Sequence, residues 1–148
     1  MSPASSRLDG SARQPKGFAI DQSRRALEVL RTVAPGVPVV QADAFSLPLH
    51  AHSVRRFFVS HLYGLLLPGE REPFLAEAYR VASEIVILDA GRPPEVNAEE
   101  WQERSLPDGG RYRVFRRHFD AEALAAEVDG RVMFDGQFYV LVGTQTPR

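Results

Sequence analysis

Cysteine is absent from all 148 residues of the chain. Without thiols the protein can form no disulfide, no thiolate metal site and no cysteine nucleophile. A secreted module held together by disulfides is therefore excluded. The fold must depend on buried apolar side chains, and a hydrophobic fraction of 44% in a chain of this length is enough for one packed domain.

An excess of charge of either sign is also lacking. The 18 Lys and Arg residues nearly balance the 19 Asp and Glu residues, so the formal net charge is −1. Such a chain has no long-range field that would attract a polyanion. We therefore expect neither nucleic acid nor an anionic membrane surface among its partners.

Long apolar runs are missing as well. The most apolar stretches, near residues 57–67 and 138–142, are shorter than the roughly 18 residues that a membrane span needs. Residues 1–16 lack the apolar centre of a secretory signal. These features predict a cytoplasmic protein without a membrane span, in which a disordered tail over 1–16 precedes one α/β domain over 17–148.

Short apolar runs alternate with helical patterns in the first part of the chain. The runs predict strands at 18–20, 38–41, 57–60 and 85–88. Ser23 is placed to cap a helix that ends at Pro35-Gly36, and Pro68-Gly69 is placed to begin another. Strands that alternate with helices in this way are typical of βαβ units around a mainly parallel sheet.

The pattern changes after Gly91. Asn97 is placed to cap a short helix through Trp101, residues 111–115 alternate like an extended segment, and Asp120 is placed to cap a further helix. Two apolar segments then flank Asp135-Gly136, a strong signal for a β-hairpin. An antiparallel hairpin is therefore expected to end the sheet.

Polar residues follow the predicted strands. Asp21 comes directly after the first strand, where a carboxylate can accept hydrogen bonds from ribose hydroxyls. The alternative is that Asp21 only begins a turn and caps the next helix. Asp43 follows the second strand, and Ser60 and His61 follow the third.

Five segments resemble, in this order, the second half of a class I S-adenosylmethionine-dependent methyltransferase of the type 11 kind. They are FAIDQS (18–23), VPVVQADAFSLPL (37–49), RFFVSHLYGLLLPGERE (56–72), EIVILDAG (84–91) and RVMFDGQFYVLVGT (131–144). The resemblance implies a Rossmann-like three-layer α/β sandwich with a mostly parallel sheet and a C-terminal antiparallel hairpin. It also implies S-adenosylmethionine as the cofactor and methyl transfer to a small-molecule acceptor.

The resemblance further implies roles for particular residues. Asp21 would hold the ribose, and the turn Asp43-Ala44-Phe45 would offer adenine an acceptor, a backbone donor and an apolar wall. His61 would take a proton from the acceptor and Tyr63 would orient it, unless both side chains simply pack under the adjacent helix. The residues implied to bind the cofactor are Asp21, Gln22, Asp43, Ala44, Phe45 and Ser60.

The beginning of the family pattern is not seen in this sequence. In the family a first strand runs into a glycine-rich turn, and residues 1–16, MSPASSRLDGSARQPK, do not resemble it. We therefore expect a domain that lacks its first strand, weak cofactor binding and impaired methyl transfer by the 148-residue chain. A homodimer could cover the open sheet.

Two other functions remain open at this stage. One is a noncatalytic, methyltransferase-like binding or interaction module. The other is a nicotinamide oxidoreductase, which the terminal hairpin and the Asp43 turn disfavour.

A metal site is not expected. His50 and His52 form a pair in a polar loop, and His61 and His118 lie elsewhere in the sequence. A metal ion would need three or four converging ligands, and the sequence near the pair offers no acidic or thiolate cluster.

Overall fold

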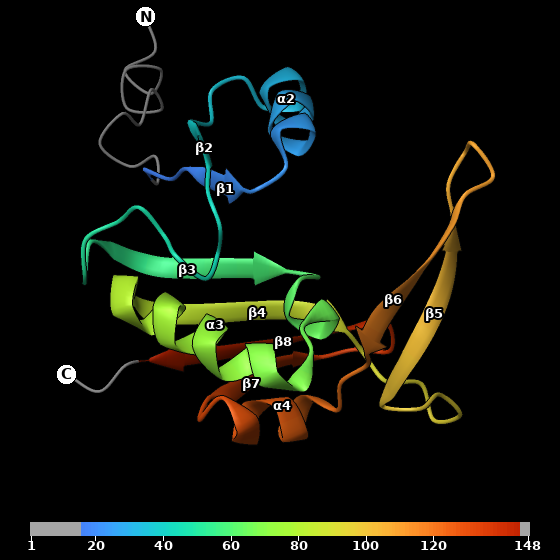
Figure 1. Ribbon diagram of the computed structural model, residues 1–148. Coiled ribbons are helices and arrows are strands. Elements are labelled where there is room, and N and C mark those ends of the chain that lie inside the picture. The colour runs from blue at the N-terminus through green and yellow to red at the C-terminus, as the bar shows by residue number, and fades with distance from the viewer. Residues whose placement is uncertain (1–15, 146–148) are drawn as a thin grey trace, which may run out of the picture. The chain divides into compact units, whose positions relative to one another are not determined.

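A computed structural model describes residues 16–145 (Figure 1). The described residues divide into two compact units, 16–44 and 45–145. The predicted disordered tail lies outside the described residues, except for Lys16, which has no regular secondary structure. Within residues 16–145, no helix is long and apolar enough to cross a membrane.

The first unit is a β–α–β segment. Strand β1 (Ala19–Asp21) leads into helix α2 (Arg24–Val33), and strand β2 (Val39–Gln41) returns parallel to β1. The Ser23 hydroxyl accepts a hydrogen bond from the Ala26 N–H at 3.2 Å, which satisfies one of the free donors of the first helical turn. The predicted capping of this helix is therefore confirmed.

A four-stranded sheet forms the centre of the second unit, in the order β3-β4-β8-β7. Strands β3 (Val54–Ser60) and β4 (Ala82–Ala90) are parallel. Strand β8 (Tyr139–Gln145) runs antiparallel to β4 and to β7 (Arg131–Asp135), so the predicted terminal hairpin is confirmed.

Two helices cover one face of this sheet, α3 (Pro68–Val81) and α4 (Ala121–Glu127) (Figure 1). Pro68 is the first residue of α3, as predicted, and the Glu70 carboxylate accepts a hydrogen bond from the Leu67 N–H at 3.0 Å. Alternate residues of β4 point to this face and are fully buried against the helices. The core side chains include Ile85, Ile87, Phe74, Val81, Leu124, Val140 and Val142.

The opposite face of the sheet is more exposed. Phe58, Met133, Phe134 and Tyr139 are large apolar side chains that each keep between 46% and 57% of their surface accessible. Phe134 and Tyr139 stack on each other with ring centroids 5.1 Å apart. Within residues 45–145 this face therefore has a partly apolar surface that α3 and α4 do not cover.

A second hairpin connects β4 to α4. Strand β5 (Glu99–Ser105) pairs with β6 (Arg111–Arg117) in an antiparallel ladder. The predicted helix from Asn97 to Trp101 is wrong. The ladder places Glu99 opposite Arg117 and packs Trp101 on Phe115 at 5.5 Å, and such cross-strand pairs outweigh a local helical preference.

The strand positions agree closely with those expected from the sequence, and the parallel pairs β1–β2 and β3–β4 and the terminal hairpin run in the expected directions. Of the five strand pairs among residues 16–145, two are parallel and three are antiparallel. The expectation of a mostly parallel sheet is therefore not confirmed. A short 3₁₀ helix, η1 (Tyr63–Leu65), fills the connection between β3 and α3.

Candidate functional site

Asp21 and Asp43 lie at the same edge of the first unit. Asp21 is the last residue of β1 and is in register with Gln41, the last residue of β2. The Ala42 N–H donates to the Asp21 carbonyl oxygen at 3.1 Å, which extends the pairing up to the residue before Asp43. The carboxyl ends of two adjacent parallel strands thus each carry an exposed aspartate.

The Asp21 carboxylate already makes one local contact. Its Oδ1 atom accepts a hydrogen bond from the Ser23 N–H at 2.7 Å. Asp21 therefore begins a turn before α2, which is the structural alternative to ribose binding. This contact uses only one of the two carboxylate oxygens. The neighbouring Gln22 accepts a hydrogen bond at its carbonyl oxygen from Gln41 Nε2 at 3.1 Å.

The other predicted site residues belong to the second unit. Phe45 is 39% exposed and packs edge-on against Phe74, with ring centroids 6.2 Å apart. Ser60 is the last residue of β3. The structure therefore brings together Asp21, Gln22, Asp43 and Ala44 in one unit, and Phe45, Ser60, His61 and Tyr63 in the other.

His61 occupies a tight turn after β3. Its N–H donates to the Leu88 carbonyl oxygen at 2.9 Å, and its backbone has a φ of 55°, in the left-handed region that few residues other than glycine adopt. About half of the side chain (53%) is exposed, and Nδ1 lies 3.9 Å from Asp89 Oδ1. This geometry presents an imidazole at the carboxyl end of the parallel pair β3–β4.

Asp89 was not identified from the sequence, yet it is the most enclosed charged residue of the second unit. Its side chain is completely buried near the end of β4. Oδ2 accepts the Gly64 N–H at 2.8 Å, and Oδ1 accepts the Ala90 N–H at 2.8 Å and contacts an Arg116 nitrogen at 3.3 Å. The sequence does carry one signal for Asp89, because it lies near the end of an apolar strand just as Asp21 does.

Tyr63 lies in the core rather than at the surface. The side chain has no accessible surface and packs against Phe74 and Phe119, with ring centroids 6.0 and 5.9 Å away. Burial, together with the nearby Glu127 carboxylate, raises the pKa of the Tyr63 hydroxyl well above its usual range. The structure thus favours the packing alternative for Tyr63 over contact with an acceptor.

No metal centre is formed by the residues that the structure describes. Within 16–145, no group of three or more His, Asp or Glu side chains is arranged to hold an ion. His50 and His52 are both exposed.

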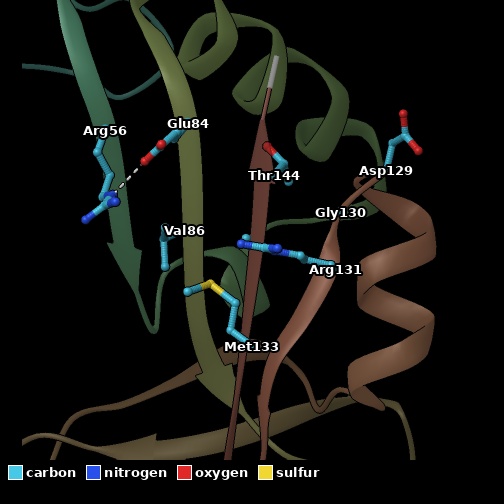
Figure 2. A pocket seen from close by; sticks show the side chains of 9 residues that line it. Arg56, Glu84, Val86, Asp129, Gly130, Arg131, Met133 and Thr144 are labelled. Atoms are coloured by element: carbon cyan, nitrogen blue, oxygen red, sulfur yellow. Dashed lines mark hydrogen bonds and ion pairs between the residues drawn. The ribbon is translucent and has the colours of Figure 1, made fainter. Parts of the chain in front are cut away.

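A hollow of about 330 Å³ lies elsewhere in the second unit, on the exposed face of the four-stranded sheet (Figure 2). An ion pair between Arg56 and Glu84, 2.9 Å long, forms one side of the hollow, and the Met133 side chain reaches across β8 toward Val86. None of the residues predicted to bind cofactor or acceptor lines it. The hollow therefore does not coincide with the predicted site.

Comparison with known proteins gave fold relatives only. No protein-family model matches the sequence, and no curated protein matches it.

Several solved structures are similar to the chain. DhpI in complex with SAH has a TM-score of 0.67 at 19% identity, over 88% of this chain and 66% of DhpI. The DhpI–SAM–HEP complex has a TM-score of 0.70 at 15% identity, over 97% of this chain and 73% of DhpI. A SAM-dependent methyltransferase from Methanosarcina mazei gives 0.67 at 14% identity, over 96% and 86%. The glycopeptide N-methyltransferase MtfA with SAH gives 0.57 at 16% identity, over 89% and 74%.

These similarities establish the fold. The chain has the α/β, Rossmann-like fold of class I S-adenosylmethionine-dependent methyltransferases, and it spans about two thirds of the length of DhpI in its SAH complex.

Proposed function

We propose that the protein belongs to the S-adenosylmethionine-dependent methyltransferases and acts on a small-molecule acceptor. The observation that carries this proposal is the position of Asp21 and Asp43 at the carboxyl ends of the parallel pair β1–β2. Ligands of open α/β sheets bind outside the carboxyl ends of the strands. The proposal is further supported by the fold relatives, whose structures include complexes with SAM or SAH.

The first unit would hold the adenosine. In this proposal the Asp21 carboxylate accepts hydrogen bonds from the ribose hydroxyls, with Gln22 beside it. The Asp43 carboxylate accepts from the adenine amino group, and the backbone N–H of Ala44 donates to a ring nitrogen.

The reacting methyl group would lie near Ser60 and His61. A lone pair of the acceptor attacks the methyl carbon, the carbon–sulfur bond breaks in line, and S-adenosylhomocysteine leaves with the bonding electrons. The proton of the acceptor passes to the exposed imidazole of His61. Alignment supplies most of the rate enhancement in such a reaction, so the protein mainly positions the two reactants.

The substitution Asp21→Ala tests the proposal. It removes hydrogen bonds to a charged group, so we expect the binding free energy for S-adenosylhomocysteine to fall by about 1.5 to 3 kcal/mol. Isothermal calorimetry of wild type and variant measures the difference, with NAD as a second ligand that should bind less tightly than S-adenosylhomocysteine.

The matched control is Asp108→Ala. Asp108 is also an exposed turn aspartate, and its Oδ1 accepts the Gly110 N–H at 2.8 Å, much as Asp21 accepts the Ser23 N–H. The control should leave binding unchanged. Equal affinity of wild type and Asp21→Ala would remove Asp21 from the site, and a preference for NAD would contradict the proposed cofactor.

A noncatalytic interaction module is the second candidate. The half-exposed Phe58, Met133 and Phe134 on the uncovered sheet face favour it, because apolar patches of this kind often mark contact surfaces. This candidate predicts no preference for S-adenosylhomocysteine over NAD in the same calorimetric experiment.

A further inference from the structure

We propose that Asp89 is a positioning residue for His61: it holds the imidazole with Nδ1 toward the sheet and Nε2 outward, ready to accept a proton. This inference deepens the proposed methyl transfer and rests on it for its chemical meaning. The arrangement itself lies entirely within the second unit and can be measured without cofactor or acceptor.

The backbone fixes the two residues next to each other. Strands β3 and β4 are parallel, with Ser60 in register with Leu88. The hydrogen bond from the His61 N–H to the Leu88 carbonyl oxygen, 2.9 Å long, continues this pairing by one residue. The left-handed conformation of His61 then turns the chain toward η1, and Nδ1 comes to lie 3.9 Å from Asp89 Oδ1.

The left-handed backbone is itself informative. A non-glycine residue in this region is destabilised by roughly 1 kcal/mol or more, and such residues are concentrated at functional positions. Surrounding contacts must therefore hold His61 in place. The next turn is equally constrained, because a Cβ atom on Gly64 would lie 2.8 Å from Asp89 Oδ1 and 2.9 Å from the Arg117 carbonyl oxygen.

Asp89 is held rigidly by groups from three elements. The Gly64 N–H of η1 and the Ala90 N–H of β4 each donate at 2.8 Å, and the Arg116 guanidinium of β6 lies 3.3 Å away. A fully buried carboxylate needs such partners, because its transfer out of water is otherwise very unfavourable. The same contacts leave Oδ1 facing the imidazole.

The carboxylate selects one form of the ring. A negative charge beside Nδ1 favours the tautomer that carries its proton there, which leaves the lone pair on Nε2 free to accept. At 3.9 Å the contact is electrostatic and longer than a hydrogen bond. When Nε2 takes a proton from the acceptor, the Asp89 carboxylate lies beside the other ring nitrogen.

Asp89 of β4 is the charged group that the structure records against the His61 ring. Its carboxylate in turn pairs with Arg116 of β6, whose side chain is only 14% exposed. The proton balance is complete: the acceptor loses its proton to Nε2, the methyl group moves from sulfur to the acceptor, and the proton then leaves His61 to water.

The test is the tautomer of His61 in the 148-residue protein with ¹⁵N-labelled histidine. Long-range ¹H–¹⁵N spectra are recorded about 2 pH units above the ordinary imidazole value of ~6.5, and His61→Gln assigns the His61 signals. We expect His61 to be mainly in the Nδ1–H form in the wild type. Asp89→Asn should shift it to a majority of the Nε2–H form.

The control is Arg116→Gln, which removes the guanidinium but keeps the carboxylate and should keep the Nδ1–H form. A wild-type His61 that is mainly Nε2–H overturns the proposal, whether or not Asp89→Asn folds. An unchanged tautomer in a folded Asp89→Asn protein overturns it as well.

The result separates this inference from the proposed function. An Nδ1–H tautomer together with no preference for S-adenosylhomocysteine would leave the positioning intact and remove methyl transfer. A preference for S-adenosylhomocysteine together with an Nε2–H tautomer would support methyl transfer and contradict the role of Asp89.

Discussion

Tyr63 and Asp89 are both completely buried, but their polar atoms differ in hydrogen bonding. Asp89 has two backbone donors and a guanidinium around its carboxylate. The Tyr63 hydroxyl makes no hydrogen bond of ordinary geometry within the described residues, although the Glu127 carboxylate lies near it, and its ring packs against Phe74 and Phe119. The buried carboxylate of Asp89 is thus compensated by polar partners, whereas Tyr63 is placed by aromatic packing.

Gly130 gives a residue-scale prediction about stability. A Cβ atom there would lie 2.6 Å from the Gly143 carbonyl oxygen of β8, the strand that pairs with β7. Because backbone must move to make room, Gly130→Ala should lower the free energy of unfolding by about 1 to 3 kcal/mol in chemical denaturation.

The control for Gly130→Ala is Gly69→Ala at the start of α3, where a Cβ atom meets nothing within 4 Å. That substitution should be neutral or slightly stabilising, because alanine restricts the unfolded chain and favours the helix. Equal effects of the two substitutions would contradict the close approach of the Gly130 and Gly143 backbones.

The positions of candidate residues could be predicted from the sequence where the signal is local. Asp21 ends β1 and Asp43 follows β2, as the apolar residues of each strand indicate, and their roles in binding stay predictions. The burial of Asp89 and its hydrogen bonds could not be recognised from the sequence, because its partners Gly64 and Arg116 are about 25 residues away on either side. Burial of Tyr63 likewise depends on Phe119, which only the folded chain brings near.

At the scale of elements, helix α3 anchors the loop that precedes β3. Glu77 Oε1 accepts the Leu47 N–H at 2.8 Å, and the Arg80 guanidinium donates to the Leu49 carbonyl oxygen at 2.8 Å while it pairs with Glu77. Hydrogen bonds from Arg80 and from the Leu47 N–H lower the pKa of Glu77 from 4.5 to about 2. The loop that contains SLPL is thereby fixed to the helix.

Glu77→Gln should therefore change the pH dependence of stability. Since the folded-state pKa is depressed, the stabilisation by Glu77 is fully present above the ordinary glutamate value of about 4.5 and is lost as the pH falls toward 2. We expect the variant to be less stable by about 1 to 2 kcal/mol at neutral pH, a range that allows for solvent screening of a half-buried pair.

Denaturation of wild type and Glu77→Gln from pH 7 downward measures this difference. The gap between the two proteins should close as the pH approaches 2. A gap that stays constant with pH would show that the Glu77 charge makes no contribution.

The elements themselves were predictable where capping residues and periodicity agree. Ser23 and Pro68 both mark helix starts, and the apolar runs mark β1 to β4 within a few residues. The helix predicted at 97–101 is wrong because a possible cap at Asn97 is only a local signal. Strand β5 is instead stabilised by cross-strand pairs with Arg113 and Arg117. Strand direction was predictable where a local signal exists, because alternation with helices indicates the parallel pairs β1–β2 and β3–β4 and Asp135-Gly136 indicates the β7–β8 hairpin.

At the scale of the molecule, the proposed chemistry is distributed over two compact units. The first unit carries the two aspartates that would hold the adenosine, and the second carries His61 with its buried partner Asp89. A two-stranded parallel pair with one helix is small for an independently stable unit. The two proposed roles are tested separately, ligand binding in the first unit and the tautomer of His61 in the second.

Binding of S-adenosylhomocysteine at the carboxyl ends of β1 and β2 can be measured by a two-dimensional ¹H–¹⁵N titration of the 148-residue chain, because even weak binding moves amide signals. We expect shifts concentrated at residues 21–23 and 42–44. This expectation would be contradicted by an unchanged spectrum at millimolar ligand, or by shifts confined to the hollow formed by Arg56, Glu84 and Met133.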